Sequence, residues 1–224
     1  VPLVCHGHSR PIVNLEYSHV TPDGVFLISS SKDGQPMLRC GDSGDWVGTF
    51  QGHKGCVWDA TLNGEATHAA TASADFSARL WNAITGDELK TFQHAHIVKI
   101  VNFSDDGGKL LTGGSEKLLR IYDLNKPEAE PYTMAGSASQ IKTASFIANA
   151  ESILSSCAED KGIRVWVVRT NTVVTTLSTE SPVMSIEVSP DGKNMTTADG
   201  KDVTFWTCKS FPRSKSGRWL MKFK

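Results

Sequence analysis

The sequence predicts an all-β protein assembled from five copies of a unit of about forty residues. The main observation is an acidic residue in a turn that precedes an aromatic residue by six positions. The pair is clear at three places and altered at two: Asp75 to Trp81, Glu116 to Tyr122, Asp160 to Trp166, Asp33 to Arg39 and Gly200 to Trp206. Its second member recurs at intervals of 42, 41, 44 and 40 residues. Repeats of this length are typical of β-propeller blades.

Each unit is predicted to form four short strands, the content of one blade of a WD-repeat propeller. The innermost strand follows a Gly-His pair such as Gly52-His53. The second strand follows the turns "TPDG", "SDDGG" and "SPDG", where Asp and Gly supply the backbone geometry. The third strand carries the aromatic residue, and the fourth follows a tight turn at Gly44, Gly86 or Asn171. Two apolar columns mark the innermost strands: Ile12, Val57, Val98, Ile141 and Val183, then Leu15, Ala60, Val101, Ala144 and Ile186.

Five repeats predict five blades over residues 1–207, whereas a seven-bladed ring with this period needs roughly 290 residues. The N-terminal "VPLVCH" is expected to be the outer strand of a blade that precedes the first repeat. Because the chain begins with Val1, the native N-terminus is expected to lie upstream. Residues 208–224 are a divergent basic segment, in which the spacing of Gly217, Leu220 and Phe223 favours the outer strand of the fifth blade over a disordered tail.

Composition excludes several classes of protein. Lys and Arg total 23 against 24 for Asp and Glu, so a net charge of −1 gives no overall attraction to nucleic acid or membrane. No apolar run approaches the roughly eighteen residues of a membrane span. The five cysteines are odd in number and form no C-x-x-C, which favours reduced thiols in the cytosol or nucleus.

The second repeat contains the residue types of a catalytic triad in His53, Ser73 and Asp75. We interpret them, with Trp81, as a buried hydrogen-bond chain that runs from the indole N–H through the hydroxyl and the imidazole to the turn carboxylate. A triad also needs an exposed nucleophile and an oxyanion site, and the sequence indicates neither. We therefore expect no catalytic residues.

No cofactor or metal is expected. His94 and His96 would place two imidazoles on one face of a strand, as in a metal site. However, His94 occupies the column of His8 and His53, and no cluster of cysteines or carboxylates completes a coordination sphere. The segment "TGGSEK" is a strand end that leads into a turn rather than a phosphate-binding loop.

A partner-binding face is predicted where the innermost strands begin, at the rim of the central channel, because propellers present their loops there on a rigid scaffold. Trp58 is the candidate anchor, since Trp and Arg are enriched at interface hot spots. The alternative is that Trp58 packs into the core between blades. The face is expected to contain Arg10, Trp58, Lys99, Lys142 and Met184.

Several stretches are more particular than a blade requires, namely "FLISSSKDGQPMLRCGDSGDW", "GHKGCVWDATLN" and "LLTGGSEKLLRIYDLNKPEAEP". They resemble the serine-threonine kinase receptor-associated protein family, also called Unr-interacting proteins. The linker "DLNKPEAEP" is the most diagnostic, because nothing in blade physics requires it. Repeats one to three match closely, repeat four loosely and repeat five weakly.

The resemblance implies a seven-bladed, non-enzymatic scaffold of the cytoplasm and nucleus, so that five blades form an open arc. It implies protein partners: the survival-of-motor-neuron complex, which assembles spliceosomal small ribonucleoproteins, Unr, and the TGF-β receptor with an inhibitory Smad, whose signalling the family dampens. Contact with RNA would be indirect and membrane insertion is not expected. The alternative is a propeller that binds RNA in mRNA metabolism, suggested by this ribonucleoprotein setting and by Lys99 and Lys142.

Overall fold

The computed structural model of the chain describes residues 4–147, 150–189, 191–200, 202–207 and 222–223. These residues form five antiparallel sheets of four strands each. The first three sheets contain β1 (Ile12–Tyr17), β2 (Phe26–Ser31), β3 (Met37–Cys40) and β4 (Trp46–Thr49); β5 (Val57–Leu62), β6 (His68–Ser73), β7 (Ser77–Asn82) and β8 (Glu88–Gln93); and β9 (Val98–Phe103), β10 (Lys109–Gly114), β11 (Leu119–Asp123) and β12 (Tyr132–Met134). The last two contain β13 (Ile141–Ile147), β14 (Ser152–Cys157), β15 (Gly162–Val167) and β16 (Thr172–Ser178); and β17 (Val183–Val188), β18 (Asn194–Asp199), β19 (Asp202–Thr207) and β20 (Lys222–Phe223).

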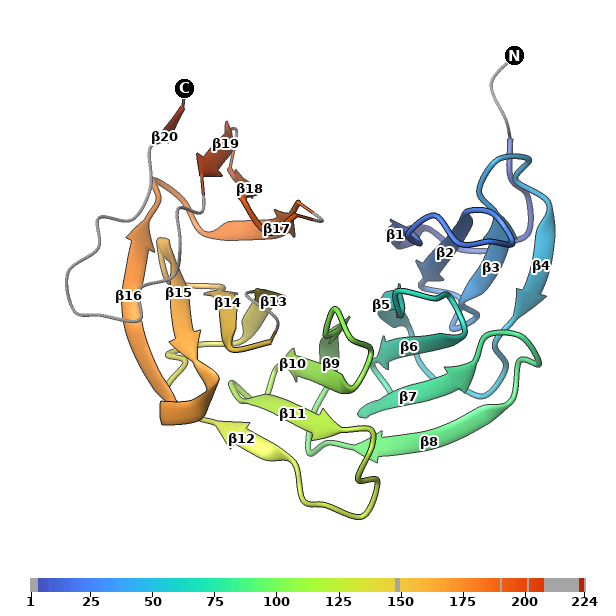
Figure 1. Cartoon of the computed structure of the whole chain (residues 1–224), viewed down its shortest axis with the longest axis horizontal. Coiled ribbons are helices and arrows are strands. Elements are labelled where there is room, and N and C mark those ends of the chain that lie inside the picture. Colours follow the sequence, from blue (N-terminus) through green and yellow to red (C-terminus); the bar gives the residue numbers. More distant parts are fainter. Residues whose placement is uncertain (1–3, 148–149, 190, 201, 208–221, 224) are drawn as a thin grey trace.

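The sheets are blades of a propeller, and each follows the chain from the centre outward (Figure 1). The innermost strands β1, β5, β9, β13 and β17 surround the centre, and each contacts the next one in this series. The first and last blades face each other across an opening, so the five blades form an arc rather than a closed ring. The predicted all-β propeller with five four-stranded blades is therefore confirmed.

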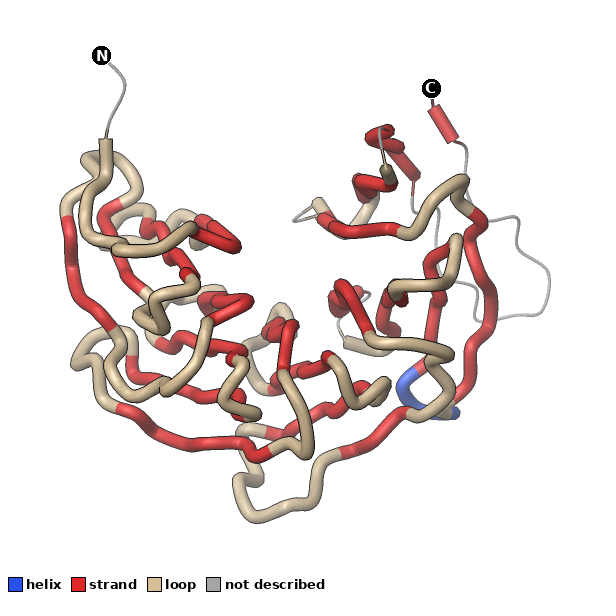
Figure 2. Tube along the Cα trace, turned by 180° about the vertical axis from the view of Figure 1, so that it is seen from behind, coloured by secondary structure: helices blue, strands red, loops and turns tan. Residues whose placement is uncertain are grey.

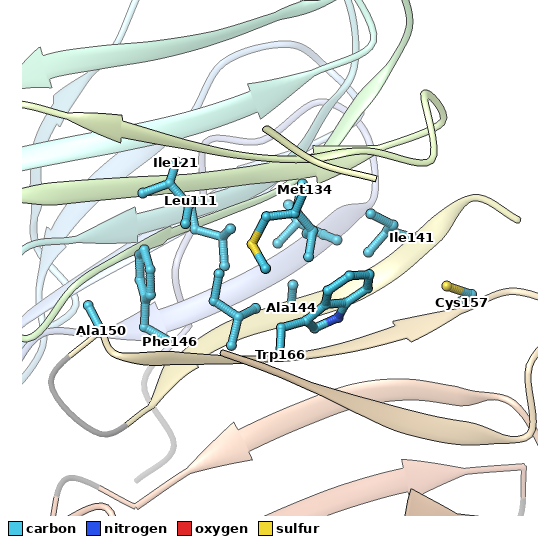
Figure 3. Packing of buried hydrophobic residues seen from close by; sticks show 12 residues of the cluster. Leu111, Ile121, Met134, Ile141, Ala144, Phe146, Ala150, Cys157 and Trp166 are labelled. Atoms are coloured by element: carbon cyan, nitrogen blue, oxygen red, sulfur yellow. The ribbon is translucent and has the colours of Figure 1, made fainter. Parts of the chain in front are cut away.

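The core lies between neighbouring blades. Figure 3 shows the contact of the third and fourth blades, where Leu111, Ile121 and Met134 pack against Phe146 and Trp166. The first and second blades meet through an equivalent cluster that includes Ile28 and Trp81. These side chains come from alternate positions of their strands, which is the pattern that buries both faces of a blade.

Tight turns before the outermost strands need a residue with positive φ. Gly44 and Gly86 have φ values of 76° and 81°, and Asn171 fills the same position with φ 52°. Glycine adopts this region without a steric penalty and Asn tolerates it better than most residues. Asn171 ends a single turn of 3-10 helix, η1 (Val168–Thr170), which Figure 2 shows in blue.

The described residues at the two ends of the chain differ in secondary structure. Within the predicted N-terminal outer strand, residues 4–6 form no strand, because an outer strand needs a neighbouring sheet to pair with. In the C-terminal segment, β20 pairs with β19, with Phe223 opposite Phe205. Gly217 and Leu220 lie outside the described residues. No helix in the described part of the chain is long and apolar enough to cross a membrane.

Candidate functional site

The second blade contains a buried chain of hydrogen bonds. The indole of Trp81 donates to the Thr71 hydroxyl over 2.9 Å, and this hydroxyl lies 2.6 Å from Nε2 of His53. The other ring nitrogen, Nδ1, lies 2.8 Å from the carboxylate of Asp75. Since an ionised carboxylate only accepts, Nδ1 carries the proton and Nε2 accepts from Thr71. The chain thus links the third strand, the second strand and the turn.

The prediction that Ser73 supplies the hydroxyl of this chain is wrong. Thr71 and Ser73 lie on the same face of β6, two residues apart, so residue type and alternation allow either. The register of β6 and β7 pairs Ala69 with Trp81, which brings the indole to Thr71. Ser73 lies nearer the turn, where its hydroxyl accepts the backbone N–H of Asp75.

The electrostatics of this chain suit a structural role. Burial opposes ionisation of Asp75, but hydrogen bonds from His53, from Ser77 and from the Lys54 backbone outweigh it and hold the pKa of Asp75 far below its usual range. The His53 side chain and Thr71 are fully buried. Because no substrate reaches a hydroxyl in this position, the arrangement orients the turn and does not present a nucleophile.

A hydroxyl at the Thr71 position recurs in every blade, which the sequence reading missed. It precedes the Arg39-Trp81 column by nine to eleven residues: Ser29, Thr71, Thr112, Ser155 and Thr197. Trp166 donates to Ser155 and Trp206 to Thr197, over 2.8 and 2.9 Å. In the first blade, His8 contacts both Ser29 and Asp33, so much of the network survives without an aromatic residue. The repeated hydroxyl was the sequence signal available for this column.

His94 and His96 have different partners in the structure. They lie in the loop between β8 and β9 rather than on a strand face. The guanidinium of Arg120 donates to Nδ1 of His94, and burial together with this positive charge lowers the pKa of His94 to about 4. His96 instead packs against Phe76, with the two rings tilted by 40°. In the described ranges, no three His, Cys, Asp or Glu side chains converge to hold a metal ion.

The predicted partner face lies at the starts of the innermost strands, and we call it the inner rim: Arg10, Trp58, Lys99, Lys142 and Met184. Three of these residues interact. The Lys99 ammonium lies 5.7 Å from the centre of the Trp58 ring, and burial followed by the positive charge of Lys142 lowers the pKa of Lys99. Arg10 precedes β1 and Met184 lies on β17, and both are exposed.

Trp58 has an unusual environment for a tryptophan. It is partly buried and lies outside the buried apolar clusters of the described chain. Its indole N–H is shielded from solvent and has no hydrogen-bond acceptor among the described residues. A shielded donor without an acceptor costs about 1–3 kcal/mol, which offsets part of what burial of the ring contributes to stability.

Two carboxyl groups that the sequence did not reveal lie between blades, where each accepts a hydrogen bond from a neighbouring blade. Burial raises the pKa of Glu16 to about 7, against the opposing hydrogen bond from Thr61. Burial likewise raises the pKa of Asp59 to about 6, against hydrogen bonds from the Val101 backbone and from Asn14. Each therefore changes charge near neutral pH. No sequence motif indicates that Glu16 and Asp59 are buried, because Glu and Asp are common on exposed strand faces.

Comparison with known proteins agrees with this geometry. The repeated sheets, buried hydrogen-bond chains and open rim define a WD-repeat propeller, and the family model for the WD domain, G-beta repeat, matches residues 44–82 and 86–123. The human serine-threonine kinase receptor-associated protein is 53% identical over 215 residues, which cover 96% of this chain and 61% of the relative.

A more distant relative extends this match. The Dictyostelium discoideum protein of the same name is 43% identical over 210 residues, covering 94% of this chain and 71% of the relative. The chain belongs to the serine-threonine kinase receptor-associated protein family. A Neurospora crassa eukaryotic translation initiation factor 3 subunit I is 40% identical over 116 residues, covering 52% of this chain and 32% of that protein. The chain spans 61% of the length of its human relative.

Proposed function

We propose that this chain is a non-enzymatic scaffold that binds protein partners through the inner rim. The observation that carries the proposal is Trp58, a large aromatic side chain at the start of β5 whose indole N–H lacks an acceptor among the described residues. Interface hot spots are enriched in tryptophan and arginine. Met184, with 57% of its surface exposed, adds apolar area on the last blade.

The family gives the partners of this proposal. They are components of the survival-of-motor-neuron complex, Unr, and the TGF-β receptor with an inhibitory Smad, met in the cytoplasm and nucleus. Membership of the family supports them. Because the chain spans 61% of the human relative, only partners whose contacts fall within these five blades would be retained.

Replacing Trp58 tests the rim as a protein-binding face. Trp58→Ala is expected to weaken binding to the partner by about 2 kcal/mol or more, because it removes the anchor from the centre of the face. Tagged wild-type and variant chains would be used to co-purify partners from cell extract, followed by mass spectrometry and by titration calorimetry with the partner identified.

A second variant separates binding from folding. Trp58→Phe retains an aromatic ring and removes the N–H without an acceptor, so it is expected to keep the fold and lose part of the affinity. A large loss of melting temperature in Trp58→Ala, with unaltered affinity per folded molecule, would show that Trp58 serves the core between blades.

Direct RNA binding is the second candidate function, and the adjacent lysines Lys99 and Lys142 favour it. Phosphate contacts make affinity fall steeply with salt. A salt titration of RNA affinity therefore separates the two functions. For a protein scaffold with a net charge of −1, we expect weak RNA binding at all salt concentrations, whereas an RNA-binding rim would bind tightly at low salt and lose affinity as salt rises.

A further inference from the structure

Three turn acids near the rim are paired with arginines, whereas four cations at or beside the rim form no ion pair among the described residues. Each of the turn acids Asp75, Glu116 and Asp160 forms an ion pair with an arginine four residues later in the chain. In contrast, none of Arg10, Lys32, Lys99 and Lys142 forms an ion pair within the part of the chain that the structure describes. These four cations are therefore available to an anionic ligand.

These cations lie on both sides of Trp58. On one side, burial raises the pKa of the Cys56 thiol; the charges of Lys32 and Arg10 oppose this rise and that of Asp33 adds to it, so these charges lie near the start of β5. The carboxylate of Asp33 is itself paired with His8. On the other side, Lys99 donates to the Gln140 amide oxygen over 2.7 Å and lies above the Trp58 ring. The cations thus follow the rim from the first blade to the fourth.

The Lys99 ammonium reaches Gln140, two residues before Lys142, and burial followed by repulsion from the positive charge of Lys142 lowers the pKa of Lys99. Neither lysine forms an ion pair with a carboxylate of the described residues. An anionic group bound between two ammonium groups removes this repulsion and forms two charge-assisted hydrogen bonds. The same ligand would contact the Trp58 indole, whose N–H has no acceptor among the described residues. This N–H could donate to the ligand once the side chains that shield it from solvent move.

Proteins and RNA both carry anionic groups that could bind here, and the residues of the rim favour a protein partner over RNA. Sequence-tolerant RNA sites combine strongly basic grooves with several stacked aromatic side chains. This rim has one tryptophan, within a chain whose net charge is −1. It also has an exposed apolar contact in Met184, which suits an apolar side chain between acidic ones.

We infer that the inner rim recognises an extended acidic segment of a partner protein, with a carboxylate held between Lys99 and Lys142 and the neighbouring residue against Trp58. This inference rests on the proposed function, since it names the chemistry of the partner for the same face.

The probe is a fluorescein-labelled peptide of about twelve residues in which Asp and Glu alternate with Ser around one Leu. Its control has Asn and Gln in place of the acids, and an oligouridine of the same length represents RNA. Fluorescence anisotropy would be measured with the full chain between about 50 and 200 mM NaCl, the range in which charge contacts separate from other contacts.

The variant is Lys99→Gln with Lys142→Gln. Its matched control is Lys126→Gln with Lys193→Gln, which removes the same charge from exposed lysines away from the rim. The acidic peptide is expected to bind the wild type and the control alike, and to bind the rim variant at least about tenfold more weakly. The neutral peptide is expected not to bind.

Equal affinity of the wild type and the rim variant for the acidic peptide would overturn the inference. So would tighter binding of oligouridine that the rim variant loses, because the rim would then be an RNA site. If Trp58→Ala loses a co-purified protein while the acidic peptide does not bind, the proposed function stands and only the acidic chemistry fails.

Discussion

Arg39 shows how one residue can replace another of different chemistry. It occupies the column of Trp81, Trp166 and Trp206, and it is buried. Its guanidinium donates to the backbone carbonyls of His6 and of Gly44, the latter over 3.2 Å. Because arginine has five donors in a planar fork, main-chain oxygens can satisfy it where no hydroxyl-indole bond is possible. The first blade thus keeps its shape with an altered network.

The Thr71 hydroxyl joins Trp81 to His53 in the hydrogen-bond chain. Thr71→Val is therefore expected to lower the free energy of unfolding by about 1–3 kcal/mol, the cost of stranding buried polar partners. His53→Ala and Asp75→Ala are expected to cost a similar amount and to abolish no enzymatic activity. Urea unfolding followed by tryptophan fluorescence measures the change.

The matched control for Thr71→Val is Thr176→Val on β16, where the side chain is exposed. It is expected to change the free energy of unfolding by less than about 0.5 kcal/mol. A Thr71 variant as stable as the control, or a variant of His53 or Asp75 that folded normally but lost a hydrolytic activity, would contradict the structural reading.

At the scale of elements, neighbouring blades are joined by polar groups as well as by apolar packing. Glu16 on β1 accepts a hydrogen bond of 2.6 Å from Thr61 on β5. Asp59 on β5 accepts the backbone N–H of Val101 on β9 over 3.0 Å, and Asn102 accepts that of Phe146 on β13 over the same distance. The inner strands expose these N–H groups toward the centre, and each is satisfied by the preceding blade.

These carboxyl groups predict a pH dependence of stability. Between the ordinary pKa of 4.5 and the folded-state pKa of about 7, folded Glu16 holds a proton that the unfolded chain has lost. The free energy of unfolding therefore falls as the pH rises through this window. Glu16→Gln is expected to remove this fall and to be more stable than the wild type at pH 8 by about 2–3 kcal/mol.

Urea unfolding of the wild type and of Glu16→Gln at several pH values between about 4.5 and 8 measures this effect. The difference between the two proteins separates the effect of Glu16 from that of His94. Because the pKa of His94 is lowered on folding, its contribution to stability is lost as the pH falls below 6.5, which is the opposite pH dependence. Glu128→Gln in the exposed loop before β12 is the control. A difference that does not vary with pH would show that Glu16 ionises as freely in the folded chain as in the unfolded one.

At the scale of the whole molecule, the ends of the arc expose surfaces that every inner blade buries. Phe205 on the last blade is 56% exposed, whereas the equivalent residues Leu80, Ile121 and Val165 are buried. Tyr17 on the first blade is 61% exposed, and its equivalent in the second blade, Leu62, is 6% exposed. Apolar flanks of this kind favour association.

The isolated chain is therefore expected to self-associate as its concentration rises. Val203→Thr combined with Phe205→Thr is expected to reduce this association, because it makes the flank of the last blade polar. Static light scattering across a concentration series measures it. Ile84→Thr, in the turn between β7 and β8, removes an even more exposed apolar side chain outside the flank and should have no effect. A monodisperse monomer that melts cooperatively at high temperature would contradict the prediction.

The sequence by itself determined the repeat, the strand order within each blade and the columns of buried residues. These features depend on spacing along the chain, because a strand alternates its faces every two residues and a turn needs Gly, Asn or Asp at a definite place. For the same reason the sequence predicted that Trp81, His53 and Asp75 would belong together.

Only the tertiary structure decided which hydroxyl joins them, what surrounds Trp58 and which carboxyl groups titrate near neutral pH. Thr71 and Ser73 share a face, and only the pairing of β6 with β7 selects between them. Lys99 lies forty-one residues from Trp58, and Asp59 gains its partners from the blades on either side. Hydrogen bonding and burial depend on distances between blades, and these distances are set by how the blades pack rather than by any local pattern.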